Sequence, residues 1–426
     1  MANNYWRDVT LKEVADVNPD SIDKKWPYDH ISYIDISSVG QGYISIKPAF
    51  ISLVDAPSRA KRRVRLGDTV LSTVRPNRRS MFYASDPSPD WIVSTGFAVI
   101  RPKQDMISPR YLYSCVFNQT FTDYLVAHEI GAAYPAVSVN DILNAPIHLP
   151  PRKEQDAIAG ILGALDDKIE LNRQLCKTLE DTAQAIFKSW FVDFDPVHAK
   201  AAGKQPVGLK PEIAALFPDS FVDSELGKIP KGWIISRLGD HFHLTMGQSP
   251  PGNTYNEDGT GDPFYQGRSD FGFRFPRNRV YCTAPKRYAE KGDTLVSVRA
   301  PVGDINMAFE HCAIGRGVAA VRHIGGSSIF TYYSMKQLRN NFVSFEAEGS
   351  VFGSITKGDF LNLPFIAPSI ALIESFDQSF AVLENSIESY ELESITLTSI
   401  RDSLLPRLIS GELKVKDAER IASRLI

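Results

Sequence analysis

The chain contains a long internal repeat, and this repeat limits what it can fold into more than any other feature. GAAYPAVSVNDILNAPIHLPP from Gly131 aligns with GSVFGSITKGDFLNLPFIAPS from Gly349, at an offset of 218 residues. The offset continues without a gap into the segments that follow. Solenoid repeats are much shorter, at about 20–50 residues. The repeat therefore predicts one domain and one long helix, present twice, with internal pseudo-two-fold symmetry.

The N-terminal part of each half repeats more loosely. WRDVTLKEVADV from Trp6 aligns with WIISRLGDHFHL from Trp233, LGDTVLSTVRP from Leu66 with KGDTLVSVRAP from Lys291, and STGFAVIRP with GRGVAAVRH. The offset changes from 227 to 225 to 221 before it settles at 218. Gaps therefore fall in the loops of this part, and we expect two domains that are built alike but carry different loops.

Each half combines strands with a helix, which predicts the α+β class. Residues 30–37, 69–74 and 96–102 have the β-rich composition of strands bounded by turn residues. Residues 108–128 read as one helix, with Ser108 as its cap and Pro109 at its first position. Residues 328–345 provide the matching helix of the second half.

A coiled-coil seam follows each α+β segment. Seam positions recur at alternating spacings of four and three, and most of them carry apolar residues. In the first seam they are Ile158, Leu162, Leu165, Ile169, Asn172, Cys176, Leu179, Ala183, Ile186 and Trp190. In the second they are Phe376, Phe380, Leu383, Ile387, Tyr390, Ser394, Leu397, Arg401, Leu404 and Leu408. Two such helices in one chain can pair antiparallel, with the polar members fixing the register. Packing of each seam on its own domain is the alternative.

These elements divide the chain into five parts. The length of 426 residues predicts two to four domains. The first α+β domain takes residues 1–150, and the first long helix takes 151–194. A Lys/Pro/Gly/Ala linker covers 195–230, the second α+β domain covers 231–367, and the second helix with a C-terminal tail covers 368–426.

The net charge of −3 hides a separation of charge along the chain. Residues 231–367 carry 15 Lys/Arg against 12 Asp/Glu and residues 1–150 carry 16 against 15, whereas both helical segments are acidic. Basic residues gather in RAKRRVR at 59–65, RPNRR at 75–79 and RSDFGFRFPRNR at 268–279. Basic residues set among aromatics are typical of a nucleic-acid-binding surface, and solvated loop charge is the plainer alternative.

The sequence shows no common catalytic, metal or membrane signature. It has no P-loop, H-E-x-x-H or G-x-S-x-G motif, and GRGVAA at 315–320 does not lead into a helix. The acidic string PDSIDKK at 19–25 lacks a second acidic strand. The four cysteines form no CxxC pair, which predicts reduced thiols in a cytoplasmic protein. No apolar run is long enough for a membrane span.

Several segments together resemble the specificity subunit of Type I restriction–modification systems. They are STGFAVIRP, NAPIHLPPRKEQDAIAGILGALDDKIELNRQ, IFKSWFVDFDPV, MGQSPPGNTYNEDGTGDPFYQG and the terminal SIRDSLLPRLISGEL. The resemblance covers nearly the whole chain. It departs at GRGVAAVR, where the first half has STGFAVIR, which leaves open how alike the DNA contacts of the two halves are.

The resemblance implies a fold and a set of partners. Two target recognition domains each read half of a split DNA site, and two long helices, paired as an antiparallel coiled coil, set the spacer. The chain itself is not an enzyme and holds no cofactor. It binds double-stranded DNA and docks two methyltransferase subunits, which carry S-adenosylmethionine. Nuclease/translocase subunits, which use ATP and Mg, complete the complex.

Residue types that can reach base edges give the candidate DNA contacts, since Arg and Lys pair with guanine and Asn and Gln with adenine. In the first domain they are Arg59, Arg62, Arg63, Arg75, Asn77, Arg78, Arg79 and, from the repeated loop, Tyr134. In the second they are Gln248, Tyr255, Asn256, Gln266, Arg268, Arg274, Arg277 and Arg299, with Ser350 and Phe352 from the repeated loop. Most of these are expected to contact phosphate or nothing.

Three other functions stay open at this point. The chain could be a nuclease or methyltransferase with an unrecognised site, or a scaffold that spaces two protein partners. It could also serve a related two-half-site system whose partner is a fused nuclease–methylase. The sequence alone does not separate them.

Overall fold

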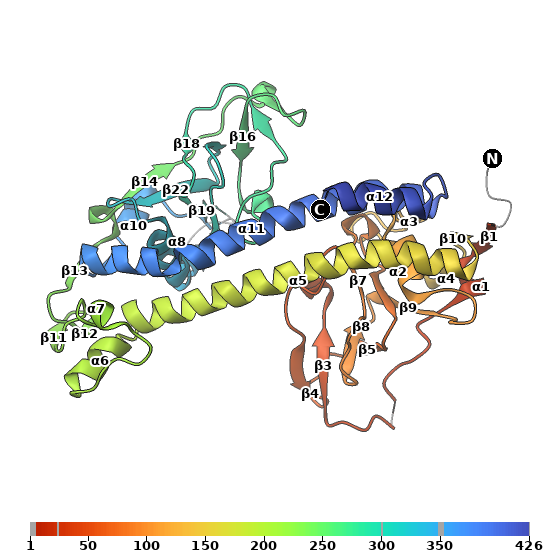
Figure 1. Cartoon of the computed structure of the whole chain (residues 1–426), viewed down its shortest axis with the longest axis horizontal. Helices are drawn as coiled ribbons and strands as arrows, with labels where there is room; N and C mark the ends of the chain where they lie inside the picture. Colours follow the sequence, from red (N-terminus) through yellow and green to blue (C-terminus); the bar gives the residue numbers. More distant parts are fainter. Residues whose placement is uncertain (1–5, 24, 300, 348–352, 426) are drawn as a thin grey trace. The chain divides into compact units, whose positions relative to one another are not determined.

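The computed structural model describes residues 6–23, 25–299, 301–347 and 353–425 (Figure 1). The chain forms two compact units. Residues 1–172 and 393–426 make up the first unit, and residues 173–392 make up the second. The long helices α5 (Arg152–Phe191) and α11 (Ile370–Ile409) each contribute to both units.

The first α+β domain is built on two four-stranded sheets. One has the order β2-β9-β6-β7 and is antiparallel throughout. The other has the order β4-β3-β8-β5, in which β3 and β8 run parallel. The strands are β2 Ala15–Val17, β3 His30–Ile34, β4 Ala49–Ser52, β5 Ala60–Arg63, β6 Thr69–Ser72, β7 Met81–Tyr83, β8 Trp91–Ser94 and β9 Phe97–Pro102. Ile34 and Val93 from one sheet pack with Val70 and Phe97 from the other in one buried cluster.

Short elements complete this domain. They are β1 Arg7–Thr10 paired with β10 Pro146–Leu149, α1 Leu11–Val14, α2 Pro109–Phe117, α3 Gln119–Ala127 and α4 Val139–Leu143. The prediction of a single helix over 108–128 is therefore wrong. Asn118 is extended, with φ −64° and ψ 141°, and divides α2 from α3. Pro109 does begin α2, but the Ser108 side chain makes no capping hydrogen bond.

The second α+β domain repeats this plan. Its antiparallel sheet has the order β14-β22-β19-β20, and a five-stranded sheet has the order β15-β17-β16-β21-β18, in which β16 and β21 run parallel. The strands are β14 Phe242–Met246, β15 Tyr255–Asn256, β16 Asp262–Tyr265, β17 Tyr281–Cys282, β18 Tyr288–Ala289, β19 Thr294–Val298, β20 Val302–Met307, β21 Cys312–Ile314 and β22 Val318–His323. The loosely repeated sequence segments thus form corresponding strands of the two antiparallel sheets.

The helices of this domain are also divided. α8 (Ser328–Gln337) and α9 (Arg339–Ala347) stand where one helix was predicted, and the chain turns at Leu338. α10 (Lys357–Leu361) and the pair of β13 (Ile234–Arg237) with β23 (Pro364–Ala367) repeat α4 and the β1–β10 pair. The segment 195–230, predicted as a linker, carries α6 Asp195–Ala201, α7 Pro211–Ala214 and the hairpin β11 Phe221–Ser224 with β12 Gly227–Pro230.

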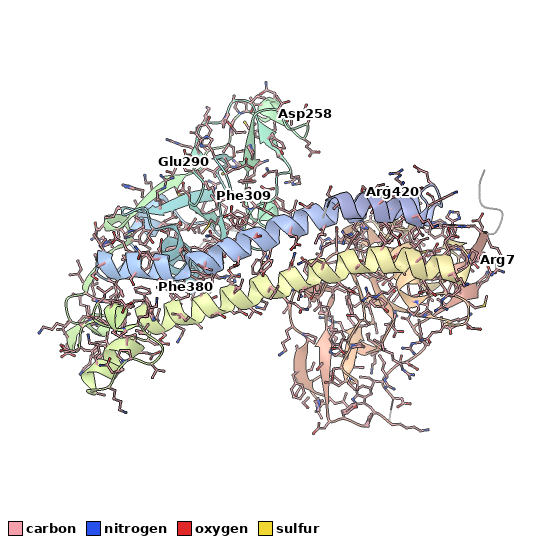
Figure 2. All side chains as sticks on the ribbon, viewed as in Figure 1. Arg7, Asp258, Glu290, Phe309, Phe380 and Arg420 are labelled. Atoms are coloured by element: carbon pink, nitrogen blue, oxygen red, sulfur yellow. The ribbon has the colours of Figure 1, made fainter. Side chains whose placement is uncertain are left out.

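The long helices pair antiparallel within each unit. In the first unit Arg401 Nη1 lies 2.9 Å from Asp166 Oδ1, and Asn172 Nδ2 donates to Glu393 Oε2 at 2.8 Å. Residues later in α5 therefore meet residues earlier in α11. In the second unit the same holds, since Cys176 Sγ lies 3.8 Å from Ile387 O, whereas Trp190, later in α5, packs on Phe380, earlier in α11 (Figure 2).

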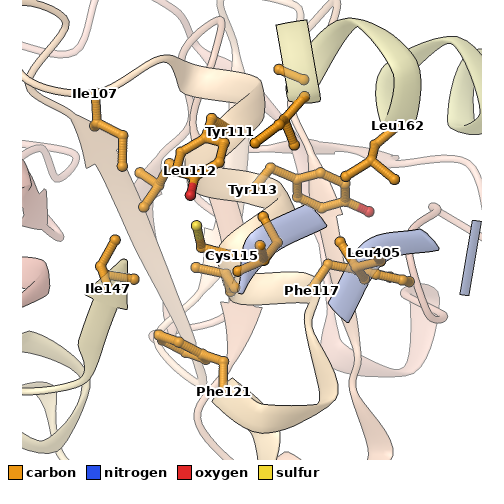
Figure 3. Close-up of a cluster of buried hydrophobic side chains, with 14 of the residues drawn as sticks. Ile107, Tyr111, Leu112, Tyr113, Cys115, Phe117, Phe121, Ile147, Leu162 and Leu405 are labelled. Atoms are coloured by element: carbon orange, nitrogen blue, oxygen red, sulfur yellow. The ribbon is translucent and has the colours of Figure 1, made fainter. Parts of the chain in front are cut away.

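The predicted seam lies inside these pairs. Leu162, Leu165, Leu397 and Leu404 join one buried cluster with side chains of α2, and Figure 3 shows Leu162 and Leu405 beside the tyrosines of that helix. Ile387 and Phe380 are buried in the second unit. The apolar members Ile169, Leu179, Ile186 and Leu383 are partly buried, as are the seam residues Tyr390, Ser394 and Arg401. Each seam thus packs on the other helix and on its own domain, and the predicted fold class is confirmed. The C-terminal α12 (Val415–Leu425) packs its apolar face on the first cluster.

Candidate nucleic-acid interface

A strained turn presents the RPNRR segment of the first domain. The 3-10 turn Pro76–Arg78 is flanked by Arg75 at φ 50° and Arg79 at φ 53°, a left-handed conformation that is uncommon for residues with a side chain. Arg75 N donates to Pro135 O at 2.7 Å, which ties the turn to the repeated loop. Such strain persists where surrounding structure imposes it, and it concentrates at functional sites.

This turn brings predicted contact residues together. The Arg75 guanidinium lies 5.4 Å from the ring centre of Tyr134, and its Nη2 lies 3.5 Å from Ala133 O. Tyr134 is 74% exposed, so its ring is available for contact. Asn77 and Arg78 at the tip are also exposed. The tip therefore offers an arginine, an amide and a cation–aromatic pair on one small surface.

Arg79 is turned inward instead. Its guanidinium donates to Phe117 O and lies 4.7 Å from the Phe117 ring centre. Burial lowers the pKa of this guanidinium. Arg79 therefore attaches the turn to the end of α2 rather than presenting a charge to solvent.

The arginines at 59–63 are partly used within the domain. Arg59 Nε donates to Tyr33 OH at 3.0 Å and its Nη2 lies 2.8 Å from Asp35 Oδ2. Arg62 Nη1 donates to Asn18 Oδ1 at 2.7 Å and to Phe97 O, and burial lowers its pKa. Arg63 lies 5.0 Å from the Trp26 ring centre. Of the three, Arg59 is the most exposed.

In the second domain, too, some predicted residues are exposed and others bond within the domain. Exposed positions are Gln248, Gln266, Arg268, Arg277 and Arg299. Tyr255 OH donates to Pro250 O at 2.7 Å, and the Asn256 amide closes a turn by donating to Thr260 O at 2.8 Å and accepting from Thr260 N at 3.0 Å. These two side chains shape the loop that holds them. Ser350 and Phe352 lie outside the described residues.

Arg274 does not fit the prediction that it contacts DNA. Its side chain is 0% exposed, and its guanidinium lies 2.9 Å from Glu384 and 3.6 Å from Glu180. A cation enclosed by carboxylates and rings has no surface to offer to a phosphate or a base. The sequence could not show this, because both glutamates lie on the distant long helices.

A hollow of about 290 Å³ opens beside this group, and two basic residues that line it, Lys336 and Arg339, were missed by the sequence prediction. Arg268 Nε and Arg339 Nη2 lie 2.8 Å and 3.0 Å from the Asp304 carboxylate, and both side chains are about 60% exposed. The half-buried Phe271 and Phe273 also line the hollow. Arg339 stands alone at the start of α9, so no clustering pointed to it.

The described residues show no group that would serve a metal or a reactive thiol. No cluster of three or more His, Cys, Asp or Glu that could hold a metal ion occurs among them. Burial raises the pKa of the Cys115, Cys176 and Cys312 thiols to about 12, which keeps them protonated at neutral pH. No helix within the described ranges has the length and apolar content needed to span a bilayer.

Comparison with known proteins identifies relatives over most of the chain. Residues 3–181 match the family model of the Type I restriction modification DNA specificity domain. The Type I restriction enzyme HindI specificity subunit of Haemophilus influenzae is 27% identical over 417 residues, with 84% of this chain and 89% of that protein covered.

Two solved structures are also similar. A chain from a structure concerned with complex assembly and conformational transition of the type I R-M system is 30% identical, with 97% of this chain and 100% of that chain covered and a TM-score of 0.40. The S subunit of the Type I restriction-modification system of M. genitalium has a TM-score of 0.54 at 15% identity, with 96% and 97% covered, and supports the fold alone. The chain belongs to the specificity subunits of Type I restriction–modification systems.

Proposed function

We propose that each recognition domain reads one half of a split, asymmetric DNA site and that α5 and α11 set the spacer between the halves. One observation carries this proposal: two equivalent antiparallel sheets are each attached to one pair of continuous antiparallel helices. The loops of the two domains differ in length and charge, so the half-sites should differ in sequence. Helices of 40 residues are about 60 Å long, which suits a spacer.

The contacts proposed for base or phosphate are the exposed members of the predicted set together with the half-buried Arg63 and Arg75. They are Arg59, Arg63, Arg75, Asn77, Arg78 and Tyr134 in the first domain, and Gln248, Gln266, Arg268, Arg277 and Arg299 in the second. Arg and Lys contacts to phosphate give affinity that falls with salt, whereas contacts to base edges give sequence preference. Tyr255 and Asn256 support the loop around them, and Ser350 and Phe352 stay predictions.

The chain is proposed to act as a non-catalytic subunit in a cytoplasmic complex. It docks two methyltransferase subunits, which bind S-adenosylmethionine and methylate adenine, and nuclease/translocase subunits that use ATP and Mg. Free, protonated thiols are consistent with a reducing compartment.

Co-expression with the methyltransferase encoded beside this chain tests the proposal. Methylated adenines are mapped across the genome by single-molecule sequencing, with each partner omitted in turn as the control. A split, asymmetric motif that needs both partners is the expected result. Methylation by this chain alone would point to an unrecognised catalytic site. A stable complex that methylates no motif would favour the scaffold function.

A further inference from the structure

Arg274 is a fully buried arginine in a loop whose other arginines are exposed. It lies between Arg268 and Arg277, in the segment predicted to contact DNA, yet its side chain is 0% exposed. Its Nη1 lies 2.9 Å from Glu384 Oε2 on α11, and its Nη2 lies 3.6 Å from Glu180 Oε1 on α5. One side chain of the recognition domain thus engages both long helices.

The helix α8 of the same domain completes the group. The Arg274 guanidinium lies 3.9 Å from the Tyr332 ring centre, and Tyr332 OH donates to Glu180 Oε1 at 2.7 Å. Tyr333 OH donates to Glu384 Oε1 at 2.9 Å and accepts from Arg274 Nη2 at 3.2 Å. Each glutamate therefore lies beside the arginine and accepts a hydrogen bond from a tyrosine, and Glu180 also pairs with Lys336 of α8 at 2.6 Å. The group joins a loop, a domain helix and both long helices through directional contacts.

Stability alone does not explain such a group. Burial raises the pKa of Glu384 above its ordinary value even beside Arg274, so the ion pair does not fully offset the loss of water. Well-packed apolar side chains can replace a buried ion cluster without loss of stability. What they cannot supply is orientation, because apolar contacts are non-directional, whereas the hydrogen bonds of Tyr332 and Tyr333 to the two glutamates and of Arg274 to Tyr333 have preferred directions.

The first half of the chain has a related but different arrangement. Asp166 precedes Glu384 by the repeat offset of 218 residues, and it pairs at 2.9 Å with Arg401. Arg401 lies on α11 and stacks at 4.7 Å on Phe117 of α2. The carboxylate position is therefore shared by both halves, whereas the arginine comes from the long helix in one and from the recognition domain in the other.

We propose that Arg274 is a positioning residue that fixes the angle of the second recognition domain on α5 and α11, and thereby the spacer length that the protein accepts. The inference rests on the proposed function, in which the helices separate two half-sites. A domain that could tilt on the helices would reach half-sites at more than one separation. The loop that carries Arg274 also carries Arg268 and Arg277, so a tilt would move both proposed contacts together.

The test compares two variants in the methyltransferase complex. The triple variant Arg274→Met, Glu180→Gln, Glu384→Gln removes the buried arginine together with both glutamates, so none of these three is left as an unpaired buried charge. Lys336, which pairs with Glu180 at 2.6 Å, is 24% exposed and keeps access to water. Arg274→Lys keeps the charge but loses the planar fork. Arg279→Met is the matched control, because Arg279 is an exposed arginine of the same loop that pairs with Asp270 at 2.9 Å. Thermal unfolding is recorded for each, together with methylation of sites with the parental spacer or one base pair more or less.

The triple variant is expected to methylate the same two half-sites. Its preference for the parental spacer over the altered spacers is expected to be at least tenfold lower than that of the wild type. Arg274→Lys should fall between the triple variant and the wild type, and Arg279→Met should keep the wild-type preference. A folded triple variant with unchanged spacer preference overturns the proposal. If the triple variant does not fold, wild-type preference in Arg274→Lys overturns it instead. A wild-type complex that methylates no split motif would instead contradict the proposed function, and this inference with it.

Discussion

Arginines from similar basic clusters of the sequence differ in the structure: some are exposed, whereas others bond within the domain. Arg78 is exposed at the tip of the strained turn, whereas Arg62 donates to Asn18 Oδ1 and to the Phe97 carbonyl. We expect Arg78→Ala to weaken DNA binding without lowering the melting temperature, and to reduce the slope of log K against log salt by about 1. Arg62→Ala should instead destabilise the fold by about 1–2 kcal/mol, because it removes two hydrogen bonds within the domain, after which Asn18 Oδ1 keeps only the bond from Val99 N. DNA titrations at several salt concentrations and thermal unfolding separate the two, and equal effects on both properties would contradict the assignment.

His323 gives the second domain a dependence on pH. It is buried between the rings of Phe242 and Phe330, at 5.2 Å and 5.7 Å, and its Nδ1 accepts from Gly325 N at 3.1 Å. Burial, assisted by His241, lowers the pKa of His323 from its ordinary value of 6.5. The unfolded chain therefore binds the proton more tightly. The stability contributed by the neutral ring is complete above pH 6.5 and falls as the pH drops toward the lowered pKa.

Denaturant unfolding at pH 7.5 and pH 5.5 measures this effect. His323→Asn, which keeps an acceptor near Gly325, should lose less stability on acidification than the wild type. His243→Asn on the neighbouring strand β14 is the control, because His243 is exposed, and it should follow the wild-type profile. An unchanged pH dependence in His323→Asn would remove His323 as the cause.

For single residues, the sequence predicts which side chains could contact DNA better than it predicts whether they are exposed or buried. The basic clusters were found from composition. Arg75, Asn77 and Arg78 do lie together on one turn, and Tyr134 of the repeated loop lies beside Arg75. Arg274 sits in an equally basic and aromatic segment but is buried. Its partners come from α5 and α11, and no local pattern shows which arginine of a loop meets distant carboxylates.

The long helices were the elements most readily predicted. Their 4–3 spacing runs for ten positions without interruption, and the repeat supplies it twice. The shorter domain helices were predicted less well, because one periodic segment can be divided by a single residue. Asn118 is extended and 4% exposed between α2 and α3, and its backbone N–H still bonds to Ser114 O at 3.1 Å. Tertiary packing therefore fixes a break that the periodicity does not reveal.

Asn172 tests the role of a polar residue in the seam. It is 0% exposed, and its amide donates to Glu393, which Lys168 also contacts at 3.2 Å. We expect Asn172→Leu to stabilise the protein by about 1 kcal/mol through added apolar burial, and to permit other helix registers or association of chains. Thermal unfolding and light scattering measure the two effects. Gln174→Leu, at an exposed neighbouring position, should give neither, and a monomeric but less stable Asn172→Leu would contradict the expectation.

At the scale of the whole molecule, duplication explains the architecture. The strand order β2-β9-β6-β7 corresponds to β14-β22-β19-β20, and each sheet is followed by a long helix at the same point of the repeat. The shared framework was predictable because the repeat conserves apolar spacing. The differing loops were not, because their conformation depends on contacts such as Asn256 with Thr260 that only one half possesses.

If the helices set the spacer, shortening both should change the spacer and leave the half-sites intact. Removing residues 169–175 from α5 and 389–395 from α11 takes one heptad from each, so the seam stays in phase. Both Asn172 and its partner Glu393 are removed, whereas the Asp166–Arg401 contact is kept. The helices become shorter by about 10 Å, which corresponds to about three base pairs.

We expect the shortened complex to methylate the same half-sites separated by about three fewer base pairs, and to ignore the parental site. The shorter spacer also rotates one half-site by about a third of a duplex turn relative to the other. Weaker methylation than that of the parental complex is therefore expected, since DNA twist or domain tilt must absorb the rotation. Exposed-face substitutions at the same positions, without a change of length, form the control and should keep the parental motif. Mapping of methylated adenines provides the measurement, and a shortened complex that still methylates the parental spacer would show that the helices do not determine it.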